Sequence, residues 1–283
     1  AANIAGAIKE AFRESSMNPN EIDLVSFTKG PGLGPCLRIG AVTARTLSLT
    51  LNKPMIAVNH PIAHVEIGRL VGKLDDPVVL YVSGGNTQVI AYSEGRYRVF
   101  GETLDIPVGN CLDVFGRNAG LSDKNMPMGR VIELEALKGK NYISIPYVIK
   151  GMDVSFSGIL THVTKLLENQ NYNLQDLSYS LQETIFAMLV EVTERALAHT
   201  KKSEILVTGG VASNKRLKQM LETMANSHKA EFRGLDAALA LDNGVMIAWL
   251  GILMKNSGIE TKIEDSTIDQ HFRPEDVEVT WRF

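Results

Sequence analysis

Two histidines separated by three residues are the clearest candidate metal ligands in this sequence. His60 and His64 stand in the stretch HPIAH. Pro61 favours the start of a helix, and residues four apart share one helix face, so both imidazoles can reach one ion. A zinc protease would carry glutamate where this chain has Pro61, so that class is disfavoured. The spacing leaves two interpretations open: a metal site, or a histidine that caps the helix.

Two Gly-Gly turns could hold an anion or a nucleotide. The stretch SGGNT (83–87) separates two apolar runs, and paired glycines let backbone N–H groups approach an anion closely. The stretch TGG (208–210) follows another apolar run and precedes a helical pattern, where Asn214 could hydrogen-bond a ribose. Each turn also has an ordinary explanation, as a hairpin in the first case and as close packing in the second.

Asp242 directly precedes an apolar helical stretch. Aspartate is a preferred N-cap, worth about 1 kcal/mol of helix stability. Its carboxylate could instead be a third metal ligand beside the two histidines. Taken in isolation, the capping interpretation is the simpler one.

The first part of the chain predicts two successive strand–loop–helix units. A helical pattern over 2–15 is followed by a strand over 22–27, and a glycine-rich turn then opens a helix that runs to about 51. A second strand over 55–58 leads directly into a helix at His60. This repeated order argues for parallel strands with helix N-termini at one edge of the sheet.

The pattern changes at Pro77. Strands over 78–83, 87–92 and 97–101 predict an antiparallel meander, and a buried strand is expected over 204–208. Helices are expected near 109–120, 130–139, 156–168, 175–199 and 212–226, with a last one from about 242. The predicted class is therefore α/β, in two lobes.

Composition and charge limit the classes of function that this chain can have. The chain has 283 residues, is 45% hydrophobic and carries a net charge of −3, without a basic stripe. If RNA is a substrate, a partner subunit is expected to contribute to RNA binding, because binding of the RNA phosphates requires Lys and Arg side chains. The longest apolar run, 245–254, is too short to span a bilayer, and no signal segment opens the chain, so a cytoplasmic protein is expected. Cys36 and Cys111 cannot form a disulfide framework, and each is expected to be a small buried residue.

Six motifs in order resemble one known family. They read VNHPIAH, YVSGGNTQV, GNCLDVFGR, GMDVSFSG, TGGVASNKRL and LDNGVMIAW. This series resembles the universal tRNA threonylcarbamoyladenosine transferases, and most of all the archaeal and eukaryotic catalytic subunit of the KEOPS complex. The resemblance runs from about Phe27 to Asp242 and continues into EDVEVTWR near the end. Chance cannot readily produce six such motifs in order.

The resemblance implies an actin/Hsp70/sugar-kinase-like (ASKHA) fold with two lobes around a nucleotide cleft. The first lobe would be 1–76 with 242–283 returning to it, and the second 77–241. It also implies one iron or zinc ion per subunit. The implied ligand types suit both metals and do not decide between them. The implied ligands are His60, His64 and Asp242, with Tyr81 near or on the metal. The implied substrate-binding or nucleotide-binding residues are Tyr81, Val82, Ser83, Gly84, Gly85, Asp113, Gly129, Glu133, Gly209, Gly210 and Asn214.

The implied reaction moves a threonylcarbamoyl group from threonylcarbamoyl-AMP to the exocyclic amine of the adenosine beside a tRNA anticodon, releasing AMP. The metal would orient the anhydride and stabilise developing charge, and positioning would supply much of the rate. No general base is evident, and Asp113 is the nearest candidate. The implied partners are tRNA and KEOPS-type subunits, including a kinase-like protein that is fused in some relatives; no membrane partner is expected.

The chain departs from the family pattern at three places. It is expected to lack the family's opening β-hairpin, which carries a phosphate-binding turn. The stretch SDKNMPMGRVIE replaces the usual Pro-Gly-Gly-Pro turn, and GLDAALALDNG lacks the usual prolines. Because a fold does not fix a function, three alternatives stay open. They are an ATPase or phosphotransferase, a small-molecule carbamoyltransferase, and a non-catalytic nucleotide-binding scaffold for a kinase-like partner.

Overall fold

The computed structural model describes residues 3–169 and 172–282, which form two compact units. Unit 1 runs up to Ile67 and resumes at Asn243, whereas unit 2 is Gly68–Asp242. The sequence was expected to divide at 76/77 and 241/242. The first boundary lies earlier because helix α3 (His60–Gly72) begins in unit 1 and ends in unit 2.

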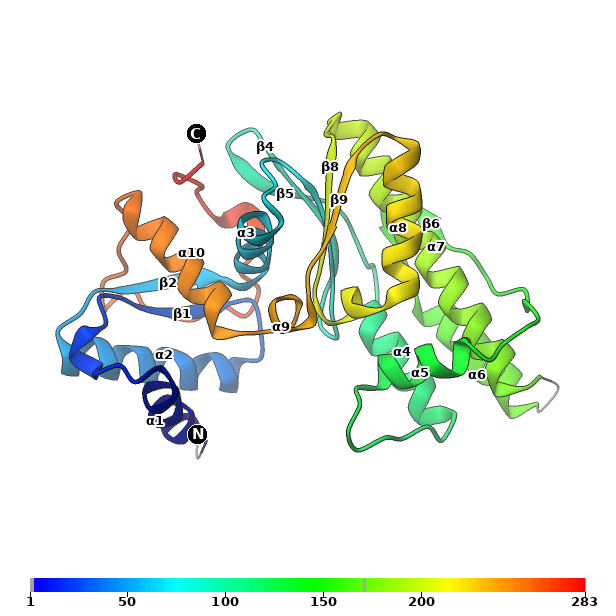
Figure 1. The fold of residues 1–283 in the computed structure, drawn as a ribbon, viewed down its shortest axis with the longest axis horizontal. Coiled ribbons are helices and arrows are strands. Elements are labelled where there is room, and N and C mark those ends of the chain that lie inside the picture. Colours follow the sequence, from blue (N-terminus) through cyan, green and yellow to red (C-terminus); the bar gives the residue numbers. More distant parts are fainter. Residues whose placement is uncertain (1–2, 170–171, 283) are drawn as a thin grey trace. The chain divides into compact units, whose positions relative to one another are not determined.

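Unit 1 is built on a parallel pair of strands, β1 (Val25–Gly30) and β2 (Met55–Asn59). Helices α2 (Gly34–Leu51) and α10 (Gly244–Asn256) lie on opposite faces of this pair (Figure 1). The predicted parallel pairing is thus confirmed, although β1 begins three residues later than expected. The remaining elements of unit 1 are α1 (Ile4–Ser15) and the short 3-10 helices η1 (Pro19–Glu21) and η3 (Pro274–Asp276); Ala2, included in the predicted first helix, lies outside the described residues.

The alternation of β1 explains why two helices can cover its two faces. Val25 and Phe27 point to one face and form an apolar cluster with Ala44 of α2. Ser26 points to the other face, where a Cβ added at Gly251 of α10 would come within 1.9 Å of its Oγ. Close approach of α10 to this strand therefore requires a glycine.

Unit 2 is built on a five-stranded sheet in the order β5-β4-β3-β8-β9. Strands β3, β4 and β5 form the predicted antiparallel meander, while β8 and β9 extend the sheet in parallel from β3. The sequence analysis missed β9, because this strand is short and alternates exposed with half-buried residues. The strands are β3 (Val78–Val82), β4 (Thr87–Ser93), β5 (Arg96–Glu102), β8 (Glu204–Thr208) and β9 (Glu231–Gly234).

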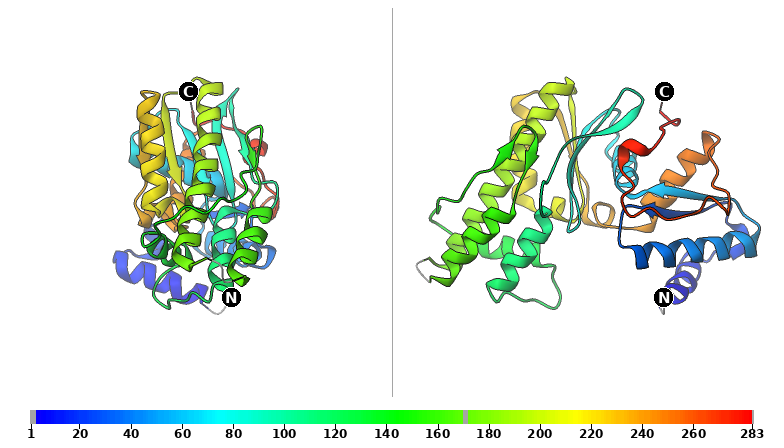
Figure 2. Two further views of the ribbon diagram at one scale, coloured as in Figure 1. Left: turned by 90° about the vertical axis from the view of Figure 1, so that its right-hand side faces the viewer. Right: turned by 180° about the vertical axis from the view of Figure 1, so that it is seen from behind.

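The helices between β5 and β9 lie on one side of this sheet, which is clearest from behind (Figure 2). Leu80 and Val207 point from the sheet into a large core that also holds Leu181 and Phe186 of the 27-residue helix α7. The elements are α4 (Val108–Asn118), α5 (Met128–Ala136), α6 (Ser157–Glu168), α7 (Leu174–Thr200), η2 (Gly210–Ser213), α8 (Lys215–Ser227) and α9 (Ala237–Ala240), with the small strands β6 (Ile149–Lys150) and β7 (Asp153–Val154).

Some expectations were wrong in detail. The helix expected over 212–226 is a short 3-10 turn followed by α8, because Asn214 is extended and caps the helix that starts after it. Cys36 is exposed rather than buried, whereas Cys111 is buried as expected. None of the helices in the described part of the chain has both the length and the apolar character needed to cross a bilayer.

Candidate functional site

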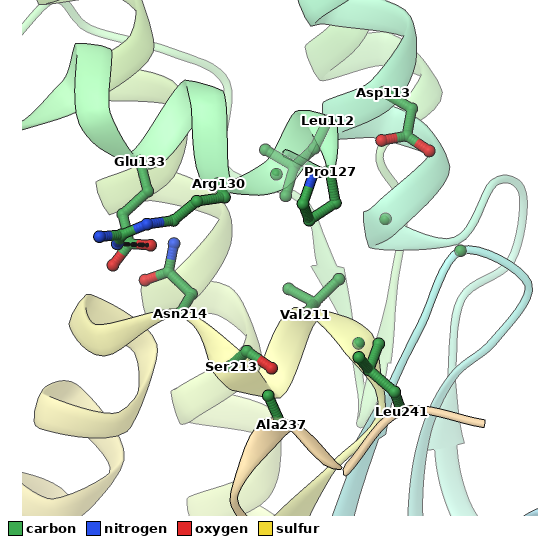
Figure 3. Close-up of a pocket in the computed structure, with 14 residues that line it drawn as sticks. Leu112, Asp113, Pro127, Arg130, Glu133, Val211, Ser213, Asn214, Ala237 and Leu241 are labelled. Carbon is green, nitrogen blue, oxygen red and sulfur yellow. Dashed lines mark hydrogen bonds and ion pairs between the residues drawn. The ribbon is translucent and has the colours of Figure 1, made fainter. Parts of the chain in front are cut away.

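A cavity of about 440 Å³ lies within unit 2, where the ends of several elements meet (Figure 3). Its walls come from the β3–β4 turn, the start of α4, the start of α5, the β8–α8 connection and the region of α9. A volume of this size suits a small-molecule ligand. The lining residues are Gly84, Gly109, Leu112, Asp113, Pro127, Gly129, Arg130, Glu133, Gly210, Val211, Ser213, Asn214, Ala237 and Leu241.

Six of the predicted nucleotide-binding residues meet at this cavity. They are Gly84, Asp113, Gly129, Glu133, Gly210 and Asn214. Five others do not line it: Tyr81, Val82, Ser83, Gly85 and Gly209. The six come from four separate stretches of the sequence, so the fold brings together residues that are up to 130 positions apart, from Gly84 to Asn214.

The β3–β4 turn presents one uncommitted donor to the cavity. The N–H of Ser83 donates to the carbonyl of Asn86 over 2.8 Å, and the N–H groups of Gly85 and Asn86 donate to the Ser83 hydroxyl. The N–H of Gly84 makes no hydrogen bond within the described residues. Because Gly84 also lines the cavity, its amide is the donor of this turn that is available to an anion.

The opposite corner of the cavity is a fixed polar cluster. Glu133, 4% exposed, accepts hydrogen bonds from Arg130 Nη1 over 2.6 Å and from the Lys215 amide over 2.9 Å. Asn214 lies beside this pair in Figure 3 and caps α8 through its side-chain oxygen. A buried carboxylate held by two donors is a pre-oriented acceptor for ligand hydroxyl groups.

Asp113 lines the cavity on the α4 side. Desolvation raises the pKa of this half-buried carboxyl above its usual value, and the charge of Arg117 only partly offsets that effect. A carboxylate with a raised pKa accepts a proton more readily at neutral pH.

Sequence reasoning missed the other eight residues of the cavity, and two of them, Gly109 and Arg130, shape its walls. A Cβ at Gly109 would come within 2.5 Å of the Ser83 carbonyl oxygen, so this glycine lets the start of α4 approach the turn. The signal for Arg130 was its place between Gly129 and Glu133, in the stretch that departs from the family pattern.

In unit 1, the two histidines stand together at the start of α3. Their ring centroids lie 5.0 Å apart at an interplanar angle of 74°, and His64 is fully buried. Asn59 accepts a hydrogen bond from the Ile62 amide over 3.2 Å and so caps the helix. The interpretation of a histidine as the cap is therefore wrong.

In unit 2, Tyr81 and Asp242 interact electrostatically. Burial raises the pKa of Tyr81 to about 12, and the Asp242 carboxylate adds to this shift, against hydrogen bonds with Ser83 and Asn86. Asp242 does not cap the following helix, because the side chain of Asn243 accepts from the Met246 amide over 2.9 Å. The capping interpretation of Asp242 is thus wrong as well.

His60 and His64 offer two imidazoles from one face of α3, and Asp242, the last residue of unit 2, offers a carboxylate. Imidazole with carboxylate suits iron and zinc among the common biological metals.

Comparisons with known proteins identify the family of this chain. The family model described as tRNA N6-adenosine threonylcarbamoyltransferase (TsaD) matches residues 1–249. A protein of Methanothermobacter thermautotrophicus, named a probable bifunctional tRNA threonylcarbamoyladenosine biosynthesis protein, is 54% identical over 97% of this chain. The chain spans about half of that relative's length, 51%. A Thermococcus kodakarensis protein named tRNA N6-adenosine threonylcarbamoyltransferase is 51% identical over 97% of this chain and 83% of its own.

Among solved structures, HypF of T. kodakarensis is similar with a TM-score of 0.72, over 95% of this chain and 45% of that one. Its sequence identity of 14% means that the likeness concerns the fold, and it confirms the predicted actin/Hsp70/sugar-kinase-like class. The family match covers most of the chain, and its relatives are more than 50% identical. This chain therefore belongs to the tRNA N6-adenosine threonylcarbamoyltransferase family.

Proposed function

We propose that this chain transfers a threonylcarbamoyl group from threonylcarbamoyl-AMP to the exocyclic amine of the adenosine beside a tRNA anticodon. The observation that carries the proposal is the cavity of unit 2. It gathers Gly84, Asp113, Glu133 and Asn214, which come from separate stretches of the sequence, in a chain of this family.

The cavity offers complementary groups for an adenylate. The free amide of Gly84 suits a phosphate oxygen, and the Glu133 carboxylate suits ribose hydroxyl donors. Leu112, Val211 and other apolar residues line the space between these two ends, where a purine can be buried favourably. On this view Gly129, Gly210 and Asn214 complete the nucleoside end. Tyr81, Val82, Ser83, Gly85 and Gly209 would support the binding turns from behind.

The proposed reaction forms one bond and breaks another at the carbamoyl carbon. The adenine amine attacks that carbon, the C–O bond to the phosphate breaks, and AMP leaves with the electron pair. The attacking nitrogen must lose a proton. Asp113 is the proposed acceptor, because its raised pKa and its place on the cavity wall suit that role. Holding the adenylate in place would supply a large share of the rate.

We further propose that His60, His64 and Asp242 hold one iron or zinc ion, with Tyr81 beside it. Such an ion, when bound, would orient phosphate or carbonyl oxygens and stabilise negative charge. The i, i+4 spacing on α3 directs both histidines from one helix face, and burial fixes the His64 ring. The two compact units would act as the two lobes of the enzyme.

The proposed partners are tRNA and KEOPS-type subunits, including a kinase-like protein. The net charge of −3 supports shared RNA binding, because a chain that grips phosphates alone usually carries a basic surface. The name of the Methanothermobacter relative describes that protein as bifunctional, which fits a second protein working beside this one. Action on tRNA would place the chain in the cytoplasm.

Transfer of labelled threonine to unmodified tRNA tests the activity. The assay supplies this chain, an adenylate-forming enzyme and the partner subunits. Label in the tRNA is the expected result. Its absence, with AMP still bound, would favour the non-catalytic scaffold instead.

Metal content of purified variants tests the donor set independently of activity. His60→Ala and Asp242→Ala should each lose most of the bound iron or zinc, while the circular dichroism spectrum stays unchanged. Elemental analysis measures the metal content. His271→Ala, an exposed histidine of unit 1 outside the pair, is the matched control and should keep its metal. Full metal content in His60→Ala would refute the assignment.

A further inference from the structure

The side chain of Asn214 is held from two directions within unit 2. Its Oδ1 accepts from the amides of Arg216 over 2.8 Å and Leu217 over 3.2 Å, at the start of α8. Its Nδ2 donates to Oε1 of Gln182 on α7 over 2.9 Å. Both side chains are nearly inaccessible, with Gln182 4% and Asn214 9% exposed.

These bonds fix which end of the amide is which. Two backbone N–H groups can be satisfied only by the oxygen of Asn214, and the Gln182 oxygen can be satisfied only by its nitrogen. The two contacts with α8 set this orientation and the Gln182 contact matches it, so rotation of the Asn214 amide alone by 180° would break all three hydrogen bonds. Leaving buried polar groups unpaired is costly.

The fixed orientation decides what the cavity offers a ligand. The oxygen of Asn214 is committed to α8, and one Nδ2 hydrogen is committed to Gln182. The second Nδ2 hydrogen has no partner within the described residues, and Asn214 lines the cavity. At this point Asn214 can therefore serve as a donor to an acceptor on the ligand, beside the acceptor Glu133.

Gln182 itself does not line this cavity. It lines a neighbouring hollow of about 430 Å³ that shares Glu133 with the first one. We infer that Gln182 is a positioning residue of the nucleotide site: it acts through Asn214, by holding the amide so that a single N–H faces the ribose of the bound adenylate. This inference rests on the proposed function and identifies what sets the arrangement of hydrogen-bond donor and acceptor in that site.

The experiment measures the dissociation constant of AMP by calorimetry in two backgrounds. Gln182→Met keeps the length of the side chain but removes its acceptor. In the chain with Asn214, we expect AMP to bind about fivefold more weakly, in line with one weakened hydrogen bond. Asn214→Ser keeps a good N-cap for α8 but has no amide, so adding Gln182→Met to it should leave the AMP affinity unchanged.

A merely structural role would give a different pattern, because the same loss would then appear in both backgrounds. That result, or unchanged affinity in Gln182→Met alone, would overturn the inference while leaving the proposed function intact. Failure of the unaltered chain to bind AMP would overturn both.

Two further variants serve as a control and as a substitute in this experiment. Gln219→Met removes an exposed amide from the wall of the same hollow, where it accepts from Arg216 and does not touch Asn214; it should bind AMP normally. If Gln182→Met does not fold, Gln182→Asn takes its place, since its amide is one methylene too short to reach Asn214. Melting temperatures of all variants separate loss of fold from loss of orientation.

Discussion

The two Gly-Gly turns of unit 2 look alike in sequence but differ in what their glycines do. Both follow the carboxyl ends of neighbouring strands, since Tyr81 of β3 pairs with Thr208 of β8. A Cβ added at Gly84 or Gly85 would meet no atom within 4 Å. A Cβ at Gly209 would come within 2.2 Å of the Val82 carbonyl oxygen, and its φ of +96° lies in a region that other residues rarely adopt.

The difference separates a glycine required by the fold from one that leaves room for a ligand. Gly209 lets the β8–α8 connection pass against the end of β3, and it does not line the cavity. Gly84 faces the cavity with a free amide and has no fold-related reason to lack a side chain. Identical dipeptides can thus be explained by packing in one place and by binding in another.

The largest expected effect is at Gly209. Gly209→Ala combines an unfavourable φ with a collision against backbone, and should lower the free energy of unfolding by roughly 3 kcal/mol. Urea denaturation measures it. Gly158→Ala is the matched control, because a Cβ there meets nothing within 4 Å and the residue lies in helix α6. A loss at Gly209 below about 0.5 kcal/mol, the size of an ordinary surface substitution, would show that the turn is freer than its geometry implies.

Gly109 provides the packing glycine that the first turn lacks. Its added Cβ would meet the Ser83 oxygen at 2.5 Å and the Gly84 Cα at 2.8 Å. Gly109→Ala should therefore cost about 2 kcal/mol in urea denaturation, by overpacking rather than by strain in φ. Gly129→Ala, at another wall of the same cavity and in open space, should not destabilise the fold. Equal losses in both variants would argue against a specific contact between α4 and the turn.

Gly84→Ala should leave the fold intact yet weaken ligand binding. We expect a change in unfolding free energy within about 0.5 kcal/mol and an AMP affinity about tenfold lower, because a methyl group would stand beside the free amide. Calorimetry with AMP gives the second value. The effect of Gly85→Ala on affinity should be smaller, since Gly85 does not line the cavity and its N–H donates to Ser83. Equal losses at both positions would mean that the ligand uses the whole turn.

Much of the fold followed from local patterns in the sequence. The parallel pair β1–β2, the β3–β4–β5 meander and the long helix α7 have clear periodicity and turn signals. Strand β9 and the four-residue helix α9 were missed, because each is short and is stabilised by neighbours distant in sequence. The capping interpretation of Asp242, the simpler one for that residue in isolation, was wrong, since Asn243, one residue later, is an equally good cap by type.

The sequence predicted which residues belong to the candidate site, but not the contacts that hold their side chains in place. The family resemblance implied Gly84, Asp113, Glu133 and Asn214, which line one cavity. No local pattern could show that Gln182 holds Asn214, or that Arg130 and the Lys215 amide hold Glu133. Those contacts depend on how α5, α7 and α8 pack together, and sequence spacing does not encode that packing.

The smallest expected effect concerns the loop that supports the first turn. Asp105 accepts from the amides of Phe156 and Ser157 and from the hydroxyls of Ser155 and Ser157. Partial burial acts to raise the pKa of this carboxyl, but these hydrogen bonds outweigh it and hold the pKa well below its usual range. The same loop reaches the hairpin, because Val108 donates its amide to the Thr87 hydroxyl over 2.8 Å.

A carboxyl whose pKa is lower in the folded state stabilises the fold above its unfolded pKa of about 4, and that contribution is lost as the pH falls further. Asp105→Asn should therefore cost roughly 1 kcal/mol at pH 7, a value reduced for the exposure of this side chain. The difference from the unaltered chain should shrink at pH 3, as urea denaturation at the two pH values would show. At pH 3, amide hydrogen exchange should become faster at 103–108 before it does around Gly209. The second turn is held by backbone packing, with no carboxylate in it. A difference that stays constant between pH 7 and pH 3 would mean that the Asp105 hydrogen bonds do not depend on its charge, and that the two turns are supported in the same way.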